Sequence, residues 1–582
     1  MDRSLVAAVA SGWIESDAPP ALQDGLFQDL DAWTADGGQP VPVLWLSLML
    51  RLDAARCRDG EISACRTALS LMPDQHYFRY RLARALHHVG DDPAALAELE
   101  PLAAMAAVDA DLLALRLEIA AAMRTDTVAL LSLTEAWFAA RPEWSAQHGS
   151  LIRILIALGA IALARRLMTE AVRTAPTAID QKVELARLAM LTGDYVAARR
   201  LFTELSSQGI ADLDLIVGRF GGTVAPYTPD VENAIRAAMA AARALPDAAL
   251  ASLPPSPCPP ITGTPKVVLV GFESTGFPND MAHHLVGSGR AAGLDISAYL
   301  DNALTMAHEV RATDAWVEAR VEAFEAEMEC RRPDVILVDW AAPLTARGLS
   351  PERLAELKHR LGFRLIVGMR DAHAAALDCM TRWLAAVDTL LLYHPLSPII
   401  AVGGDTVFVG WLPVHLPALA RTEGRDLNLS FVGSVAFTLR NALLSVLLTE
   451  DLPFTAIIGE RRKTELPDMA AYLSLLGRSR ATLNISAHTH DEHLVTGRVW
   501  ESIAMETLLV EQDNPATASY FTPWRHYLPW RSVDDIAHIC RFVERNPAEV
   551  AAVAAEAHAW AARHYSAERF WRGLMAHAMR ND

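Results

Sequence analysis

The stretch LPPSPCPPITGTP (residues 253–265), followed directly by the apolar run KVVLVGF (266–272), decides how this chain of 582 residues is organised. Its clustered prolines cannot continue a helix or lie in the middle of a sheet. Before it, alanine and leucine recur at helical spacing, and after it, short apolar runs alternate with helical segments. We therefore expect a linker at 251–265 between a helical region and an α/β region.

Residues 1–250 are predicted to be nearly all helical, because few β-branched runs interrupt the alanine and leucine. Gly90, Gly159 and Gly193 are separated by 69 and 34 residues, and Arg124 occupies the skipped position between the first two. The spacing predicts helix pairs joined by a tight turn that glycine permits, with a small residue on the second helix for close packing. Small residues and prolines recur with the same step (Ala95, Ala129, Ala164 and Ala198; Pro73, Pro142 and Pro176).

This pattern resembles the tetratricopeptide repeat (TPR), most clearly in LIALGAIALARRLMTEAVRTAP (155–176) and LARLAMLTGDYVAARRLFTEL (185–205). A generic helical bundle is the alternative. In either case the region would be a scaffold, and stacked repeats commonly present a concave peptide-binding surface. The segment NAIRAAMAAARAL (233–245) is expected to form one more helix that caps the repeats.

Beyond the linker, two sets of apolar runs predict two doubly wound α/β domains, over 266–415 and 416–582. Runs that are apolar throughout, rather than alternating, are typical of buried parallel strands. Two such domains would share a cleft, and sheets of this kind bind ligands beyond the carboxyl ends of their strands. The runs are KVVLVGF, PDVILVDW (333–340), FRLIVGMRD (363–371) and DTLLLYH (388–394), then LNLSFVGS (427–434), FTAIIGE (454–460), ATLNISA (481–487), TLLVEQDN (507–514) and HYLPW (526–530).

The first two strand ends of the second domain carry candidates for phosphate binding. Gly433 and Ser434 end one run, a small pair that lets backbone N–H groups approach a phosphate, and Arg440 follows at the start of a helix. The next run is followed by GERRKTE, in which three cations including Lys463 would hold a diphosphate or, equally, form a solvated surface.

A helix in the second domain carries Arg498 and Glu501 before the run TLLVEQDN. A carboxylate at Glu501 can accept hydrogen bonds from both hydroxyls of a ribose, and Arg498 can meet a phosphate or orient that carboxylate. An exposed salt bridge on the helix is the alternative. The nearby HTHDEH (488–493) suggests zinc, but its spacing matches no closed tetrahedral set. We expect its histidines, His488 among them, to line the ligand cleft instead.

In the first domain, the loop GFESTGFPND places Gly271, Gly276 and Asn279 at the end of the opening strand. One alternative for this loop is a plain turn, and the other, which the family resemblance given next implies, is a position near a sugar and its acceptor. Candidates for a base that takes a proton from an acceptor follow later strands, and the sequence does not select among them. These candidates are Asp371, His373 and His394.

The order of segments from strand-Gly-Ser to Arg498-x-x-Glu501 resembles the C-terminal domain of CgeB-type and related family-one glycosyltransferases, over 427–579. The resemblance implies a GT-B fold of two Rossmann-like domains, with the last helix returning to the N-terminal one. It assigns Glu501 to the donor ribose and Arg440, Lys463 and Arg498 to the diphosphate. Gly433, Ser434, Asn484 and His488 complete the predicted donor site.

Two positions depart from this family's pattern. Many relatives have Ala-x-Gly after the glutamate, whereas Ala504 and Met505 are followed here by Glu506. Relatives with a pair of glutamates eight apart have the first where this chain has His493. We therefore do not expect the backbone amide at Glu506 to pack on the donor as it would at a glycine.

The bulk composition excludes some functions. A formal charge of −18 argues against general nucleic-acid binding, which needs a basic face. The cysteines are scattered without a Cys-x-x-Cys pair, and the N-terminal apolar run is too short to span a membrane, so we expect a cytoplasmic protein without a transmembrane segment.

The sequence thus predicts a metal-independent glycosyltransferase whose co-substrate is a nucleotide-sugar, such as a UDP-sugar, with no other cofactor. A protein acceptor held by the TPR-like region is expected by analogy. The alternatives are synthesis of a polysaccharide or lipid-linked glycan, and a non-catalytic interaction protein.

Overall fold

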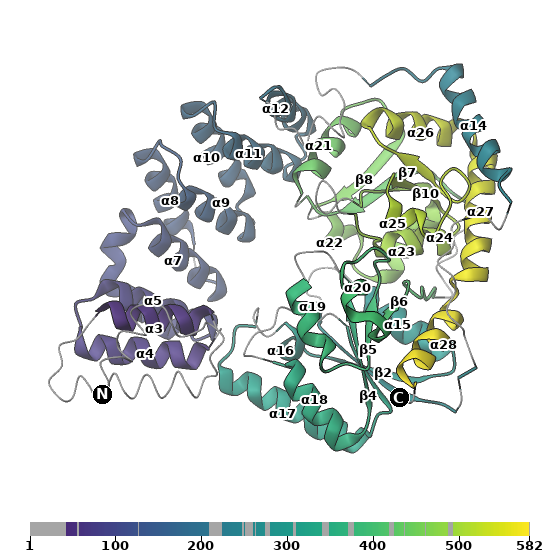
Figure 1. Ribbon diagram of the computed structural model, residues 1–582. Coiled ribbons are helices and arrows are strands. Elements are labelled where there is room, and N and C mark those ends of the chain that lie inside the picture. Colours follow the sequence, from purple (N-terminus) through teal and green to yellow (C-terminus); the bar gives the residue numbers. More distant parts are fainter. Residues whose placement is uncertain are drawn as a thin grey trace. The chain divides into compact units, whose positions relative to one another are not determined.

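The structure is a computed structural model that describes residues 42–54, 57–125, 127–208, 224–246, 250, 260–261, 263–273, 280–306, 310–339, 348–370, 377–417, 424–435, 437–459, 461–486 and 493–580. It contains an N-terminal series of helices followed by two parallel sheets (Figure 1). Within the described residues, no helix has the length and apolar character needed to cross a membrane. The helices of the series are α3 (Pro42–Ala54), α4 (Arg58–Leu71), α5 (His76–His88), α6 (Asp92–Leu99), the 3-10 helix η1 (Glu100–Ala107), α7 (Ala110–Ala122), α8 (Val128–Ala140), α9 (Ala146–Ala157), α10 (Ile161–Thr174), α11 (Ile179–Leu191) and α12 (Tyr195–Ser207).

The turns between the paired helices have the predicted left-handed backbone. Gly90, Gly159 and Gly193 have φ of 86°, 75° and 76°, and Arg124 adopts the same region with φ of 54°. Because Arg124 has a Cβ, it takes this conformation at a cost that glycine avoids. The TPR-like region is therefore confirmed in its turns. Three of the four predicted small residues are fully buried, Ala95, Ala164 and Ala198, but the prediction for Ala129 is wrong because this residue is exposed.

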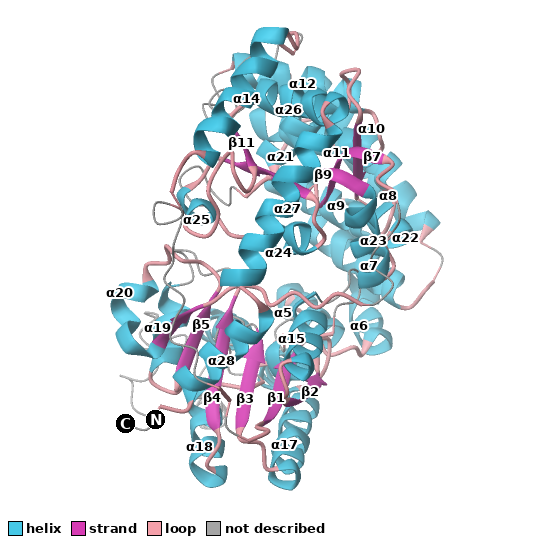
Figure 2. Ribbon diagram, turned by 90° about the vertical axis from the view of Figure 1, so that its right-hand side faces the viewer, coloured by secondary structure: helices cyan, strands magenta, loops and turns pink. Residues whose placement is uncertain are grey.

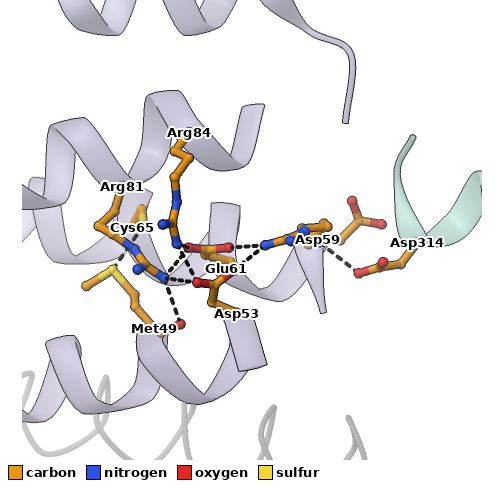
Figure 3. A network of polar contacts seen from close by, with 9 residues as sticks. Met49, Asp53, Asp59, Glu61, Cys65, Arg81, Arg84 and Asp314 are labelled. Atoms are coloured by element: carbon orange, nitrogen blue, oxygen red, sulfur yellow. Dashed lines mark hydrogen bonds and ion pairs between the residues drawn. The ribbon is translucent and has the colours of Figure 1, made fainter. Parts of the chain in front are cut away.

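A buried network of charges joins α3, α4 and α5 (Figure 3). Arg58 donates to Asp53 and to Glu61 at 2.6 Å and 3.0 Å, and Arg81 donates to Glu61 at 2.5 Å. Burial raises the pKa of Glu61 although its neighbours include Arg81. Every charge of this network has a partner inside the helical region, so the network is structural in character.

The first sheet has six parallel strands in the order β2-β1-β3-β4-β5-β6. Figure 2 shows β1 to β5 of this sheet. Strands β1 and β3 to β5 were predicted from their apolar runs, while β2 and β6 were not. Helix α15 packs on β1 and β2, α19 packs on β5 and the C-terminal α28 packs on β4 and α15. We call this sheet with α15, α19 and α28 the first lobe. Its elements are β1 (Lys266–Gly271), α15 (Asp280–Ala291), β2 (Asp295–Leu300), β3 (Val335–Asp339), β4 (Arg364–Met369), α19 (Leu377–Leu384), β5 (Thr389–Leu392), α20 (Ile399–Gly403), η4 (Gly404–Thr406), β6 (Val407–Val409) and α28 (Ala567–Ala578), while α16 (Asn302–Thr305), α17 (Asp314–Arg331) and α18 (Pro351–Leu361) connect its strands in sequence.

The second sheet has five parallel strands in the order β11-β10-β9-β7-β8, and all five runs predicted for it form strands. We call this sheet and its helices the second lobe. Each lobe has the parallel sheet and flanking helices of a Rossmann-like domain. The elements are β7 (Leu427–Gly433), α21 (Thr438–Leu447), β8 (Phe454–Ile458), α22 (Arg461–Glu465), α23 (Met469–Arg478), β9 (Ser479–Asn484), α24 (Gly497–Ala504), β10 (Leu508–Gln512), α25 (Pro515–Ala518), β11 (Leu528–Trp530), α26 (Val533–Arg545) and α27 (Pro547–His564).

The chain divides into two compact units. One contains the helices up to α10 together with residues 301–331 and 342–353, and the other contains α11, α12, α14 (Pro229–Arg243) and both sheets. In the second unit, one apolar core joins the lobes and includes Leu269, Ile366, Trp500 and Trp571. The lobes can therefore be treated as one body.

Two helical segments before the linker belong to the unit of the sheets. Helices α11 and α12 pack on α21, where Arg199 lies 2.8 Å from Glu450 and donates to Thr449 at 2.8 Å. Helix α14, expected to cap the repeats, packs instead on α26, and Arg236 bonds Glu549 at 3.0 Å. The expectation that α14 caps the repeats was therefore wrong. An amphipathic helix can bury its apolar face against any apolar surface, so the sequence pattern did not identify its packing partner.

Candidate functional site

The site lies where the strand order of the second sheet reverses. From β7 the chain proceeds to β8 on one side and returns to β9 on the other. The loops that leave the carboxyl ends of β7 and β9 therefore diverge, which opens a crevice for ligands at this point in doubly wound sheets. Side chains that join these two strand ends are the first candidates for binding.

An aromatic ring forms the base of the site. Phe431 of β7 is fully buried, and a Cβ added to Gly433 would lie 2.4 Å from its ring. A Cβ at position 433 would force the buried ring of Phe431 to move, which favours the glycine that ends the strand. The guanidinium carbons of Arg440 and Arg498 lie 6.0 Å and 5.1 Å from the centre of the same ring. The ring brings two cations from different helices together.

Arg440 reaches across the sheet from α21. It donates to the Ser434 hydroxyl at 3.1 Å and to the Ile485 carbonyl at 3.5 Å, so it joins the ends of β7 and β9. Its guanidinium also lies 4.9 Å from the ring of Phe437, which is exposed. Ser434 and Arg440 were predicted to act together, and the structure brings them into contact.

Arg498 joins the same strand ends from the other side. It lies in the first turn of α24, donates to Asn484 Oδ1 at 2.9 Å, and also donates to the Val432 carbonyl. Asn484 in turn accepts from the Thr496 hydroxyl at 3.2 Å and is fully buried. The predicted donor residues Asn484 and Arg498 are therefore direct partners.

The cluster is electropositive. Burial, with the charges of Arg498 and Arg462, lowers the pKa of Arg440 to about 10, and burial with the charge of Arg498 also lowers the pKa of Arg462. Among the described residues, no carboxylate forms an ion pair with Arg440 or Arg498, and the Nε atom of each is buried without a hydrogen-bond partner. Cations that repel one another are stabilised by a multiply charged anion.

Glu501 lies one turn after Arg498 on α24 and is 2% exposed. The Tyr472 hydroxyl donates to Glu501 Oε2 at 2.8 Å, and His284 Nε2 lies 3.2 Å from Oε1. His284 comes from α15 of the first lobe, so a side chain of each lobe contacts one carboxylate.

A second buried acid lies behind Arg498. Glu511 of β10 accepts from Asn484 Nδ2 at 2.7 Å and from Asn514 Nδ2 at 3.2 Å. Burial raises the pKa of Glu511 to about 7, although these hydrogen bonds and the charge of Arg498 act in the opposite direction. Asn484 thus separates Glu511 from Arg498 while bonding both.

The other predicted residues are placed as follows. Gly271 ends β1 in the buried sheet, and His394 is buried after β5. The side chain of Lys463 lies outside the described residues. Three binding or loop residues of the predicted set and two base candidates also lie outside the described residues, namely Gly276, Asn279 and His488, and Asp371 and His373.

Sequence reasoning missed His284 and Glu511 as parts of this site, and it named Arg462 only as one of three cations in the run 461–463. Arg462 stands in the run that drew attention to Lys463, and a helical phase over 461–465 would have separated it from Arg461, which bonds Glu465 at 2.6 Å. His284 lies 217 residues before its partner Glu501, and no local pattern signals such a contact. Glu511 carried a signal, since a glutamate inside an apolar strand is costly unless it has partners.

Helical repeats followed by two Rossmann-like lobes, with cations gathered where the second sheet reverses, define the GT-B class of architecture with a TPR-like region. Residues 430–576 match the family model described as "Glycosyl transferase-like". The match begins in β7 and ends in α28, and so includes Arg440, Arg498 and Glu501. No curated protein matches the chain.

Several solved structures are similar to parts of the chain. HepE of Anabaena in complex with UDP and glucose is 12% identical, with a TM-score of 0.39 over 54% of this chain and 98% of that chain. A mutant O-GlcNAc transferase of Thermobaculum terrenum is 12% identical, with a TM-score of 0.32 over 91% and 95%. A TPR protein of Thermus thermophilus is 20% identical, with a TM-score of 0.22 over 29% and 92%.

Proposed function

We propose that this chain is a glycosyltransferase that binds the diphosphate of a nucleotide-sugar at the arginine cluster of the second lobe. The observation that carries the proposal is the pair Arg440 and Arg498, which converge on Phe431 and form no ion pair with a carboxylate of the described chain. The family match over 430–576 supports transfer of a sugar as the reaction.

The cluster would act on the leaving group. Transfer breaks the bond between the anomeric carbon and the diphosphate oxygen, forms a bond from that carbon to the acceptor oxygen, and passes the acceptor proton to a base. The negative charge that develops on the diphosphate is stabilised by fixed cations that need no reorganisation during the step. Arg440 and Arg498 would be these cations, with Lys463 and His488 as further donor-site proposals.

Other residues receive roles that remain proposals. Gly433 and Ser434 would let the backbone approach the phosphates, Asn484 would hold Arg498, and Glu501 would contact the ribose. Gly271, Gly276 and Asn279 would border the sugar and acceptor, and the base would come from Asp371, His373 or His394. Among the described residues no group of three or more His, Cys, Asp or Glu is arranged to hold a metal ion, and the proposed mechanism uses none.

The acceptor is proposed to be a protein that the TPR-like region recruits, because stacked helical pairs present extended binding surfaces. A polysaccharide or a lipid-linked glycan would be the acceptor if the helices serve assembly instead. Incubating the full chain with the donor and each acceptor class, and measuring incorporated sugar, distinguishes these cases.

The donor is tested by thermal unfolding of the full chain with UDP, UDP-glucose and GDP-mannose. A nucleotide-sugar that binds the folded state alone stabilises it by about 2.7 kcal/mol at 100 times its Kd. We expect one of these ligands to raise Tm, and Glu501→Ala to abolish the shift. The matched control Glu544→Ala removes an exposed carboxylate from α26 and should leave the shift unchanged. No shift with any nucleotide-sugar at millimolar concentration would overturn the proposal.

A further inference from the structure

We infer that His284 of the first lobe and Tyr472 of the second are positioning residues that fix the Glu501 carboxylate, and that they make the site select ribonucleotides over deoxyribonucleotides. The inference rests on the proposed function, in which Glu501 contacts the donor ribose. It adds two residues that hold the carboxylate and a specificity that follows from them.

The carboxylate of Glu501 has one protein donor on each oxygen. Tyr472 donates to Oε2 at 2.8 Å, and His284 Nε2 lies 3.2 Å from Oε1. All three side chains are buried. Rotation of the carboxylate would break at least one of these bonds, so its orientation is fixed by contacts from two directions.

The proton on His284 is assigned by its other neighbour. The backbone N–H of His415 donates to His284 Nδ1 at 3.0 Å. Because Nδ1 accepts, the neutral imidazole carries its proton on Nε2 and donates it to Glu501. His284 therefore needs no positive charge to hold the carboxylate.

The surroundings of His284 preserve this arrangement. A Cβ added to Gly287 of α15 would lie 2.2 Å from the ring of His415, so this glycine allows His415 to approach the helix. Burial lowers the pKa of both His283 and His415. These neighbours therefore stay neutral near pH 7 and do not compete for the Glu501 charge.

A carboxylate accepts about four hydrogen bonds, so two protein donors leave capacity for the hydroxyls of a ribose. A fixed acceptor gains more from a hydroxyl than a mobile one, because no rotational freedom is lost on binding. A site that holds a buried acceptor for a hydroxyl also rejects the analogue that lacks it. The arrangement therefore predicts discrimination at the 2′ position of the donor sugar.

The test is isothermal titration calorimetry of the full chain with UDP and with 2′-deoxy-UDP. We expect wild type to prefer UDP by about tenfold or more, the range for a hydrogen bond to a charged group. Tyr472→Phe removes only the hydroxyl and His284→Leu removes the donor, and each should bring the preference close to one. His284→Gln keeps an N–H donor and should restore most of it.

The matched control is Tyr527→Phe, which removes a buried hydroxyl of the second lobe that has no hydrogen-bond partner among the described residues. Its preference for UDP should equal that of wild type. Failure of wild type to bind UDP, together with no rise in Tm from UDP, UDP-glucose or GDP-mannose, would overturn the proposed function. Equal binding of both nucleotides by wild type, or a preference that survives in Tyr472→Phe and His284→Leu, would overturn this inference while leaving donor binding intact. Tyr472→Phe decides the matter if His284→Leu does not fold.

Discussion

Each lobe has an acid of one strand near an arginine that follows a neighbouring strand in the chain, but the two lobes connect the acid and the arginine differently. In the first lobe, Asp339 ends β3 and bonds Arg370, which follows β4, with Nε 3.1 Å from Oδ1. In the second lobe, Asn484 stands between Glu511 and Arg498 and bonds both, at 2.7 Å and 2.9 Å.

In the proposed function, this difference determines which lobe binds an anion. The charge of Arg370 is neutralised by a carboxylate that is 1% exposed. The charge of Arg498 is held by an amide, which fixes the side chain without neutralising it. One Asn in place of an acid thus converts a structural ion pair into an available cation, and neighbouring Arg440 adds a second.

The largest expected effects come from removing Arg498 of the second lobe and, in a separate variant, Arg370 of the first lobe. Arg498→Ala should weaken UDP binding by about 100-fold, the loss of a charge-assisted contact to a phosphate. Arg370→Ala should leave UDP affinity unchanged but lower the free energy of unfolding by roughly 3 kcal/mol, because Asp339 stays buried without its partner. Calorimetry and thermal unfolding measure these effects, and equal loss of UDP affinity in both variants would remove the proposed difference between the lobes.

The second expected effect is a pH dependence that comes from Glu511. Burial raises its pKa from the ordinary 4.5 to about 7, so the folded state favours the protonated acid. The stability that this proton supplies is complete below pH 4.5 and is lost as the pH rises through about 7, by about 3 kcal/mol. Glu511→Gln should therefore gain stability relative to wild type from pH 5 to pH 8 in thermal unfolding. A constant difference between the two proteins over this range would contradict the assignment.

A smaller effect is expected from giving the second lobe the arrangement of the first. Asn484→Asp places a carboxylate beside Arg498 and should weaken UDP binding by about tenfold, as attraction within the protein replaces attraction to the ligand. Asn428→Asp makes the same change beside another arginine, since Asn428 Oδ1 accepts from Arg480 at 2.8 Å. This control should keep wild-type affinity, and a matching loss in both variants would mean that net charge alone acts.

The smallest effect concerns the backbone at two positions where a glycine is expected. Glu506 takes φ of 53° where many relatives of the resembling family have glycine, and Arg124 takes φ of 54° where other repeats have it. Glu506→Gly and Arg124→Gly should each raise the free energy of unfolding by up to about 1 kcal/mol. This is the net result of relieving the strain at positive φ and of the opposing entropy that glycine adds to the unfolded chain. Gly193→Ala should destabilise by a similar amount. A lower Tm in both glycine variants would show that other contacts compensate for the strain.

Most of the fold could be predicted from the sequence because long apolar runs signal buried parallel strands. Strand β2 was not predicted because its buried residues do not form a continuous apolar run. Strand β6 was not predicted because it has only three residues. The turn positions were predictable from spacing, and even Arg124 keeps the backbone of the glycine that it replaces. The division of the helices between the two units followed from tertiary contacts such as Arg199 with Glu450, which no periodicity shows.

The candidate site was predictable only in part. Arg440, Arg498 and Glu501 follow strand ends or begin helices, so their place in the chain pointed to the cleft. Asn484, which ends β9, was also predicted. Glu511 and His284 were not, because Glu511 lies inside an apolar strand and His284 belongs to the other lobe. Local spacing reports which element carries a residue, and the fold decides which residues of distant elements meet.

The central claim is that the diphosphate of the donor binds at Arg440 and Arg498, and a crystal structure of the full chain with UDP tests it most directly. The account predicts phosphate oxygens within hydrogen-bond distance of both guanidinium groups, with the ribose beside Glu501. UDP bound in the first lobe, or with its phosphates away from both arginines, would contradict it.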